Sequence, residues 1–269
     1  MASVAYFFLA ILAVAAAAPD SRIVGGDHVT IEESPYVVSL TYLYPGPGIT
    51  VQRCVGTLVS SFHAITTAFC YTGAVLENFQ IRAGSTNSLA GGVVVGIANV
   101  VKHPDYTETP RSNDIAVTFL SSALGISNTV NVLYLPPVNY NIPDGQSVKV
   151  VSWGFESETG AQLETLKSVY LNKLSVEDCQ AVYADSEDVT VSDAVICAAA
   201  PGKGMCRGDS GAPMVMNNAL VGISSFFQEC LTDVYPDVFT RVDRYTNWIL
   251  GVASSNSRSS GIRVAPVAL

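Results

Sequence analysis

Three short segments of this chain carry residue types that can take part in covalent chemistry. They are Arg22-Ile23-Val24-Gly25-Gly26, Asn113-Asp114-Ile115-Ala116 and Gly208-Asp209-Ser210-Gly211-Ala212-Pro213. A serine hydroxyl is a poor nucleophile unless a base removes its proton. Each segment alone is a weak signal. The three can form one site only if the strands and loops that carry them bring them together in the fold.

Most of the chain consists of short runs rich in Val, Ile, Leu and Tyr, separated by Gly, Pro, Asn, Asp and Ser. Residues Tyr36–Tyr42 and Val148–Trp153 are two such runs. This spacing predicts antiparallel strands that close into barrels or sandwiches. Pro136-Pro137 lies near the middle of the chain and predicts a linker between two halves.

Helical periodicity is convincing only near the end, from about Arg241 to Val252. Four residues could share one face of that helix: Val242, Tyr245, Trp248 and Ile249. Ser175 is a plausible N-cap of a shorter helix. The tail, residues 253–269, is rich in Ser without a clear period, and we expect it to be flexible and unstructured.

Composition sets the class of protein. The 269 residues are 49% hydrophobic and 14% charged, which is enough apolar material for one large or two small domains. The net charge is -9 and no basic run is present. Nucleic acid and membrane surfaces are therefore disfavoured as partners.

The first 18 residues form an apolar stretch that ends in small residues, as a secretory signal peptide does. The alternative, a membrane anchor, would need about 20 apolar residues. We expect a secreted, extracellular protein, whose six cysteines are paired in an oxidising compartment and do not bind metal. The sequence alone allows 15 connectivities. No cofactor or metal is expected.

Taken together and in this order, the three segments resemble the trypsin/chymotrypsin-like serine endopeptidases, from Ile23 to about Leu250. Other stretches look most like the insect and crustacean digestive members: Glu33-Ser34-Pro35-Tyr36, His103-Pro104-Asp105-Tyr106, Gly202-Lys203-Gly204 and Tyr235-Pro236-Asp237-Val238-Phe239-Thr240-Arg241-Val242. The resemblance implies an all-β fold of two packed, antiparallel six-stranded β-barrels with a C-terminal helix. It divides the chain into an activation propeptide (19–22), an N-terminal barrel (23–135) and a C-terminal barrel with the helix (136–252).

The resemblance also assigns roles. Ser210 would attack a peptide carbonyl, Asp114 would orient a histidine base, and the backbone N–H groups of Gly208 and Ser210 would hold the oxyanion. The histidine position falls in Thr66-Thr67-Ala68-Phe69-Cys70 and is occupied by Phe69. Phenylalanine has no group that can accept a proton. The milder change to Ala212, in place of a second glycine after the serine, is tolerated in some family members.

None of the three histidines is a convincing substitute base. His63 lies on a predicted strand six residues before Phe69, a span of roughly 20 Å if the chain is extended. His28 follows the activation sequence and His103 lies in a structural turn. We expect all three to be surface or framework residues.

Activation and crosslinking are further implications of the resemblance. Cleavage after Arg22 would free the amine of Ile23 to pair with the carboxylate of Asp209. An inward Asp209 would also hide the adhesion-like tripeptide Arg207-Gly208-Asp209. The implied disulfides are Cys54–Cys70, Cys179–Cys197 and Cys206–Cys230.

The specificity pocket departs from that of trypsins. By resemblance Gly204 lies at its base, so the aspartate that selects Lys and Arg is missing, and Asp237 lies on its other wall. Ser225-Phe226-Phe227 replaces a pattern that ends in glycine, and glycine is needed where a substrate passes close to the backbone. We predict that Phe227 caps or fills the pocket; the alternative is that Phe227 points into solvent.

Three functions follow. The first is a secreted, monomeric serine protease homologue without peptidase activity that binds a protein partner, such as a protease inhibitor or another protease. The second is a weak or atypical digestive endopeptidase that uses Ser210. The third is a structural or nutritive protein with no specific partner.

Overall fold

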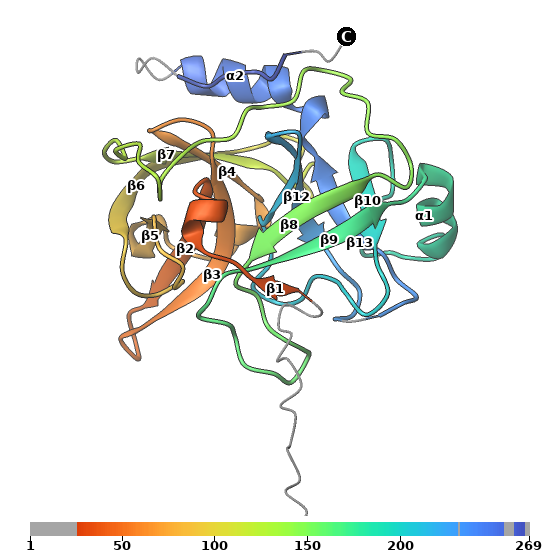
Figure 1. The fold of residues 1–269 in the computed structure, drawn as a ribbon, viewed down its shortest axis with the longest axis horizontal. Helices are drawn as coiled ribbons and strands as arrows, with labels where there is room; N and C mark the ends of the chain where they lie inside the picture. The colour runs from red at the N-terminus through yellow and green to blue at the C-terminus, as the bar shows by residue number, and fades with distance from the viewer. Residues whose placement is uncertain (1–25, 231, 256–260, 267–269) are drawn as a thin grey trace, which may run out of the picture.

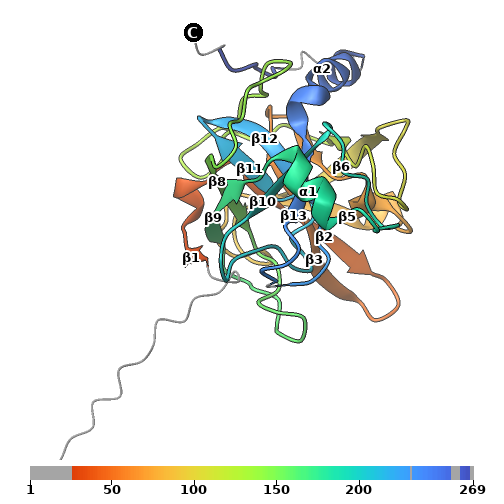
Figure 2. The same ribbon diagram turned by 90° about the vertical axis from the view of Figure 1, so that its right-hand side faces the viewer.

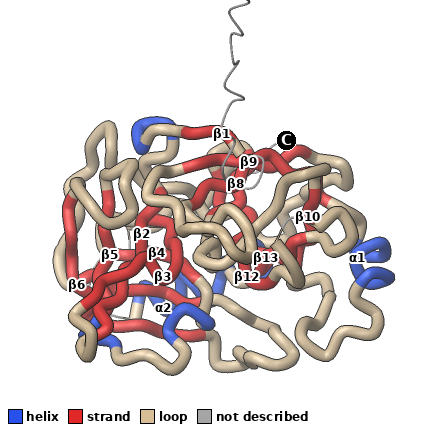
Figure 3. The backbone as a smooth tube through the Cα atoms, turned by 90° about the horizontal axis from the view of Figure 1, so that it is seen from below, coloured by secondary structure: helices blue, strands red, loops and turns tan. Residues whose placement is uncertain are grey.

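Two β-barrels lie side by side in the computed structural model, which describes residues 26–230, 232–255 and 261–266 (Figure 1). The N-terminal barrel, orange to yellow, is next to the C-terminal barrel, green to blue, and helix α2 (Thr246–Ser254) lies across one end. The view from below shows the same pair of strand clusters, with loops filling the space around them (Figure 3). The predicted all-β architecture of two antiparallel six-stranded barrels with a C-terminal helix is confirmed.

The first barrel closes in the order β2-β3-β4-β7-β6-β5. Its strands are β2 (Val37–Tyr44), β3 (Ile49–Leu58), β4 (His63–Thr66), β5 (Phe79–Ala83), β6 (Val93–Lys102) and β7 (Ala116–Leu120). Successive side chains of a strand point to opposite faces. Val38, Leu40 and Tyr42 accordingly fill the inside of this barrel, whereas Val37 joins the core that is shared with the second barrel. Both faces of β2 are thus buried, which fixes the two barrels against each other.

The second barrel contains β8 (Ser147–Ser152), β9 (Lys167–Lys173), β10 (Val195–Ala199), β11 (Pro213–Met216), β12 (Ala219–Phe226) and β13 (Asp237–Arg241). The order is β9-β10-β13-β12-β11-β8, and pairing between β8 and β9 closes the ring. A short strand, β1 (Asp27–His28), pairs with β9 and extends this sheet, although it precedes the first barrel in the sequence. The start of the described chain is therefore attached to the second barrel.

The predicted helices are confirmed. Helix α1 (Val176–Val182), seen face-on in Figure 2, begins after Ser175, whose hydroxyl accepts a hydrogen bond of 3.0 Å from the N–H of Asp178. The C-terminal helix starts as the 3₁₀ turn η4 (Val242–Arg244) and continues as α2. Three of the four residues on its predicted face are buried, and the fourth, Trp248, is half-buried. The other 3₁₀ turns are η1 (Ile31–Glu33), η2 (Phe69–Tyr71) and η3 (Leu76–Asn78).

The tail was predicted to be unstructured from residue 253, and this is wrong for residues 253–254 and 261–266. Helix α2 extends to Ser254. Further on, the N–H of Leu135 donates to the carbonyl of Arg263 (2.9 Å), and the N–H of Ala265 donates to the carbonyl of Leu135 (2.8 Å). Ile262 and Ala265 also pack against the shared core. The segment is ordered because Leu135, in the connection between the barrels, offers it backbone hydrogen-bond partners. Such pairing leaves no helical or strand periodicity in the sequence, so the pattern of residues did not reveal it.

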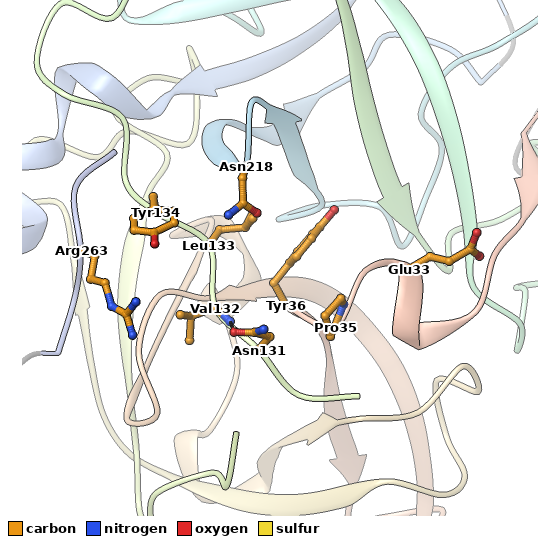
Figure 4. A pocket seen from close by; sticks show the side chains of 9 residues that line it. All are labelled: Glu33, Pro35, Tyr36, Asn131, Val132, Leu133, Tyr134, Asn218 and Arg263. Atoms are coloured by element: carbon orange, nitrogen blue, oxygen red, sulfur yellow. Dashed lines mark hydrogen bonds between the residues drawn. The ribbon is translucent and has the colours of Figure 1, made fainter. Parts of the chain in front are cut away.

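Arg263 of this C-terminal segment lines a cavity of about 370 Å³ together with residues that precede β2, residues 131–134 and Asn218 in the turn between β11 and β12 (Figure 4). Its lining residues are Glu33, Pro35, Tyr36, Asn131, Val132, Leu133, Tyr134, Asn218 and Arg263. No described residue of the three chemistry-bearing segments contributes to it. Among the described residues, no helix is long and apolar enough to cross a membrane.

Candidate active-site cleft

Ser210 lies in a loop that precedes β11 and is fixed against the first barrel. Its carbonyl accepts a hydrogen bond of 2.9 Å from the N–H of Val55 on β3. The next residue, Gly211, has a φ of 84°, and a Cβ there would lie 2.1 Å from the carbonyl oxygen of Val55. Only glycine can occupy this position without moving the strand. The glycine after the serine is therefore what places the hydroxyl at the junction of the barrels.

The two predicted oxyanion donors are available. Within the described chain, neither the N–H of Gly208 nor that of Ser210 donates a hydrogen bond. The loop is held instead through the carbonyl of Gly208, which accepts a hydrogen bond of 2.9 Å from the Nε2 of Gln52. Gln162 in turn donates to the carbonyl of Gln52 (2.8 Å). Sequence reasoning missed both glutamines, because nothing in their local sequence places them beside this loop.

Asp209 points into the protein, as expected. Its carboxylate is 1% exposed and accepts hydrogen bonds from the N–H groups of Gly154 (2.9 Å) and Cys206 (2.8 Å). Desolvation by burial raises the pKa of Asp209 to about 6. The adhesion-like tripeptide is therefore not displayed on the surface. The predicted partners, Arg22 and Ile23, lie outside the described residues.

Asp114 is also buried and is surrounded by donors. Its Oδ1 accepts a hydrogen bond from the N–H of Phe69 (2.8 Å), and its Oδ2 accepts one from the hydroxyl of Ser225 (2.7 Å). Desolvation raises the pKa of Asp114 above its ordinary value, and these hydrogen bonds oppose that shift. The carboxylate is thus held in place by the backbone of Phe69 and by the hydroxyl of Ser225.

Arg111 takes up part of the space beside Phe69. Its guanidinium carbon lies 4.0 Å from the centre of the Phe69 ring, and its Nη1 donates to the carbonyl of Ser225 (3.0 Å). The same Nη1 is 3.9 Å from Oδ2 of Asp114. A cation this close to an aromatic face is attracted to the ring. The buried charge of Asp114 is therefore balanced by a guanidinium, a residue that sequence reasoning did not single out.

The histidines have other roles. His63 is buried, with its Nδ1 2.7 Å from the hydroxyl of Ser60 and its ring edge-on to Phe119 at 4.9 Å. His103 contacts the rings of Tyr245 and Trp248, and desolvation lowers its pKa. His28 is exposed on β1. None of the described residues that line the cleft around Ser210 is a histidine.

That cleft has a volume of about 320 Å³ and is lined by Arg53, Phe69, Arg111, Arg207, Gly208, Ser210, Ser225, Phe226 and Phe227. Phe227 is half-buried and packs against the shared core, so it does not point into solvent. Phe226 is half-buried as well, with its ring edge-on to Tyr183 at 6.0 Å. Three phenylalanines thus form much of the wall.

Gly204 and Asp237 are not among the described residues that line this cleft. Asp237 is 6% exposed and accepts a hydrogen bond of 2.9 Å from the N–H of Met205. A Cβ on Gly204 would lie 3.2 Å from Oδ2 of Asp237, so the two residues are in contact. Desolvation raises the pKa of Asp237 well above its ordinary value. The carboxyl is buried against Gly204 and Met205 and does not line this cleft; capping of the pocket by Phe227 stays a prediction.

All three implied disulfides are present. They are Cys54–Cys70, Cys179–Cys197 and Cys206–Cys230. The first lies at the cleft, since the Sγ of Cys70 is 3.8 Å from the carbonyl oxygen of Ser210. No group of His, Cys, Asp and Glu side chains in the described part of the chain could hold a metal ion.

Comparison with known proteins shows which protein family the chain is similar to. A family model described as Trypsin matches residues 23–249. The chain is 34% identical to alkaline trypsin C of Manduca sexta over 90% of its own length and 97% of that protein. It is 33% identical to the vitellin-degrading protease of Bombyx mori, over 89% of the chain and 90% of that protein.

Among solved structures, the fold is similar to that of an inactivated protease paralogue of the scabies mite. The TM-score is 0.79 at 24% identity, covering 88% of this chain and 99% of the other. The barrels, the disulfides, the Ser210 loop and these matches agree. The chain belongs to the trypsin family of serine proteases.

Proposed function

We propose that this chain is a secreted serine protease homologue that lacks peptidase activity and acts by binding a protein partner. One observation carries the proposal. Phe69 occupies the position of the general base, and Arg111 is stacked on its ring 4.0 Å away. Neither side chain can take a proton from Ser210, because phenylalanine has no acceptor and an arginine stays protonated in proteins.

The energetic consequence of losing the base is large. Removing the histidine of a serine protease triad costs about 10⁶ in turnover, which corresponds to about 8–9 kcal/mol of barrier. The donors around Asp114 and the N–H groups of Gly208 and Ser210 do not replace a proton acceptor. Proteolysis at a physiological rate is not expected.

A binding role is favoured by what the cleft keeps. The cleft has a volume of about 320 Å³ and is shaped by the Ser210 loop with its two oxyanion donors and by the first disulfide. A protein surface of this kind suits a segment of a protease inhibitor, for which the chain would act as a decoy, or of another protease. The apolar residues 1–18 support secretion, and we propose that the mature chain is a monomer.

A second candidate is a weak endopeptidase. The available N–H groups of Gly208 and Ser210 favour it, because an oxyanion hole and substrate binding alone give about 10³–10⁴ over the uncatalysed reaction. The base would then be water or a histidine of the substrate. Such an enzyme would still depend on the hydroxyl of Ser210.

Both candidates are tested on protein cleaved after Arg22 and purified free of other proteases. We would measure hydrolysis of a panel of peptide and ester substrates and labelling by a fluorophosphonate, with Ser210→Ala as the control. Absence of both reactions in folded protein supports the binding role. Turnover that Ser210→Ala abolishes would overturn it in favour of the endopeptidase.

A further inference from the structure

The cleft around Ser210 carries the opposite charge to the rest of the molecule. Arg53, Arg111 and Arg207 all line it, although the protein has a net charge of -9. The family resemblance did not predict these three arginines, and catalysis by Ser210 has no use for them. Their charges need partners, either within the protein or in a ligand.

Of these three arginines, only Arg111 has a carboxylate of the described residues within ion-pair distance. That carboxylate belongs to Asp114, which is buried and lies 3.9 Å from Arg111. Neither Arg53 nor Arg207 lies within ion-pair distance of a carboxylate of the described residues. Of the three guanidinium groups at the cleft, two therefore have no ion-pair partner among the described residues.

Backbone and ring contacts hold these guanidinium groups in place without neutralising them. Arg53 donates to the carbonyls of Cys70 (3.0 Å) and Thr72 (2.9 Å). Arg207 is exposed, donates to the carbonyl of Glu158 and lies over the ring of Phe155 at 4.9 Å. These side chains are therefore pre-positioned at the cleft, which lowers the entropy that a ligand must overcome.

Arg111 has a donor without an acceptor. Its side chain is 14% exposed, and its Nε is buried with no hydrogen-bond partner. A buried donor left unpaired costs free energy, so the described residues do not use the full hydrogen-bonding capacity of this guanidinium. The N–H groups of Gly208 and Ser210 are two further donors on the same cleft wall.

From these observations we propose that the cleft binds a carboxylate-bearing segment of a protein partner. The carboxylate would be received by Arg111, by Arg207 and by the N–H groups of the Ser210 loop, with neighbouring apolar atoms against Phe69 and Phe227. Arginine suits this role because its guanidinium is planar and binds carboxylates through paired hydrogen bonds. This proposal rests on the proposed binding function and names the chemistry that the partner must present.

The carboxylate has two possible sources, which peptides can distinguish. We would label three peptides of the same length at the N-terminus. The first has a central Glu and a C-terminal amide, the second a central Gln and a C-terminal amide, and the third a central Gln and a free C-terminal carboxylate. Binding to the intact and to the Arg22-cleaved protein is measured by fluorescence anisotropy, and chromatography checks that each peptide stays uncut.

We expect at least one of the two carboxylate peptides to bind about tenfold more tightly than the neutral one, a difference of about 1.4 kcal/mol. The difference should shrink as salt is raised from 50 to 500 mM, because salt screens exposed charges. Preference for the Glu peptide identifies a side chain as the source, and preference for the free terminus identifies a chain end. Equal binding of all three peptides, or no binding, overturns the proposal.

Variants locate the site. Arg207→Gln and Arg111→Gln should each reduce the preference several-fold, whereas Arg244→Gln, which removes an exposed arginine outside the cleft, should leave it unchanged. Arg207 is exposed, so its variant remains a test if Arg111→Gln fails to fold. A preference that falls equally in Arg207→Gln and Arg244→Gln reflects net charge alone, and a preference that survives Arg207→Gln and Arg111→Gln does not depend on the cleft; either result overturns the proposal. Peptide cutting would instead contradict the proposed function, so the two failures are distinguishable.

Discussion

The guanidinium of Arg111 lies 4.0 Å from the centre of the Phe69 ring, and its Nη1 is 3.9 Å from Oδ2 of Asp114. An aromatic ring covered by a permanent cation thus lies beside the buried aspartate, at the residue that the family resemblance predicts to be the histidine position. The cation compensates the charge of the aspartate, and neither side chain of the pair can accept a proton. Phe69 and Arg111 are therefore coupled in space, although the two residues are distant in the sequence.

This coupling predicts that Phe69→His alone is a poor repair. An imidazole at residue 69 would face the guanidinium of Arg111, which disfavours the imidazolium that forms when the base accepts a proton. Combining Phe69→His with Arg111→Leu removes that cation. We expect the double variant to exceed the single variant in kcat/KM by about tenfold or more on ester substrates, because a working general base contributes about 10²–10⁴.

The matched control is Arg111→Leu alone, which should be inactive. Adding Ser210→Ala to the double variant should abolish any activity gained. If Phe69→His alone is as active as the double variant, Arg111 does not hinder the base. If neither gains activity while both are folded, the pocket or the oxyanion hole has also been lost.

Asp209 predicts a pH dependence of stability in the protein that is not cleaved after Arg22. The pKa of Asp209 is about 6 in the folded protein, against an ordinary value of 3.8. The folded state thus favours the protonated carboxyl. This group does not affect the free energy of unfolding below about pH 4; its ionisation then lowers that free energy by about 3 kcal/mol in total as the pH rises to 6 and above.

Urea denaturation at pH 4 and pH 7.5 measures this loss, and Asp209→Asn should make the decline shallower. Asp114 and Asp237 also have raised pKa values, so part of the decline will remain in that variant. Cleavage after Arg22 should reduce the contribution of Asp209 if the new amine of Ile23 pairs with it. Parallel pH profiles for the wild type and Asp209→Asn would contradict the prediction.

Gly154 should be irreplaceable because of Asp209. A Cβ on Gly154 would lie 2.1 Å from Oδ1 and 2.4 Å from Oδ2 of that carboxylate. Gly154→Ala must displace Asp209 and with it the Ser210 loop, and we expect a loss of about 3 kcal/mol in the free energy of unfolding. Gly46→Ala is the control, since nothing lies within 4 Å of its Cβ position; its effect should stay within about 1 kcal/mol. Thermal unfolding compares the two, and equal melting temperatures would contradict the argument.

The C-terminal segment should stabilise the junction of the barrels. Ending the chain after Ser260 removes both backbone hydrogen bonds to Leu135 and the packing of Ile262 and Ala265. We expect a loss of about 1–3 kcal/mol, measured by urea denaturation. A chain that ends after Pro266 is the control and should match the full-length protein. If both shortened chains are equally stable, the segment contributes nothing.

Local sequence was sufficient for several elements. Ser175 caps α1 because its hydroxyl meets an N–H three residues ahead, and the face of α2 follows from the helical period. The resemblance carried by the three motif segments gave the two barrels and the disulfide pairs. It also predicts that Phe69 is the residue in the histidine position, because each motif is read from adjacent residues.

The ordered C-terminal segment could not be predicted in this way. Its order depends on the backbone of Leu135, and the linker reaches that position only after both barrels have formed. Strand β1 is a similar case, since its partner β9 belongs to the other barrel. Such pairings are set by the arrangement of distant strands, which no local pattern records.

By itself, then, the sequence determined the family fold, because residue types and local spacing carry that information; that Phe69 takes the place of the base stays a prediction from the resemblance. Only the tertiary structure decided what surrounds Phe69. Arg111 lies on Phe69, Gln52 holds the loop of Ser210, and Asp237 is enclosed away from the cleft. The physical reason is that these contacts arise where separate loops converge between two packed barrels, and their energies depend on distance and burial rather than on order in the chain.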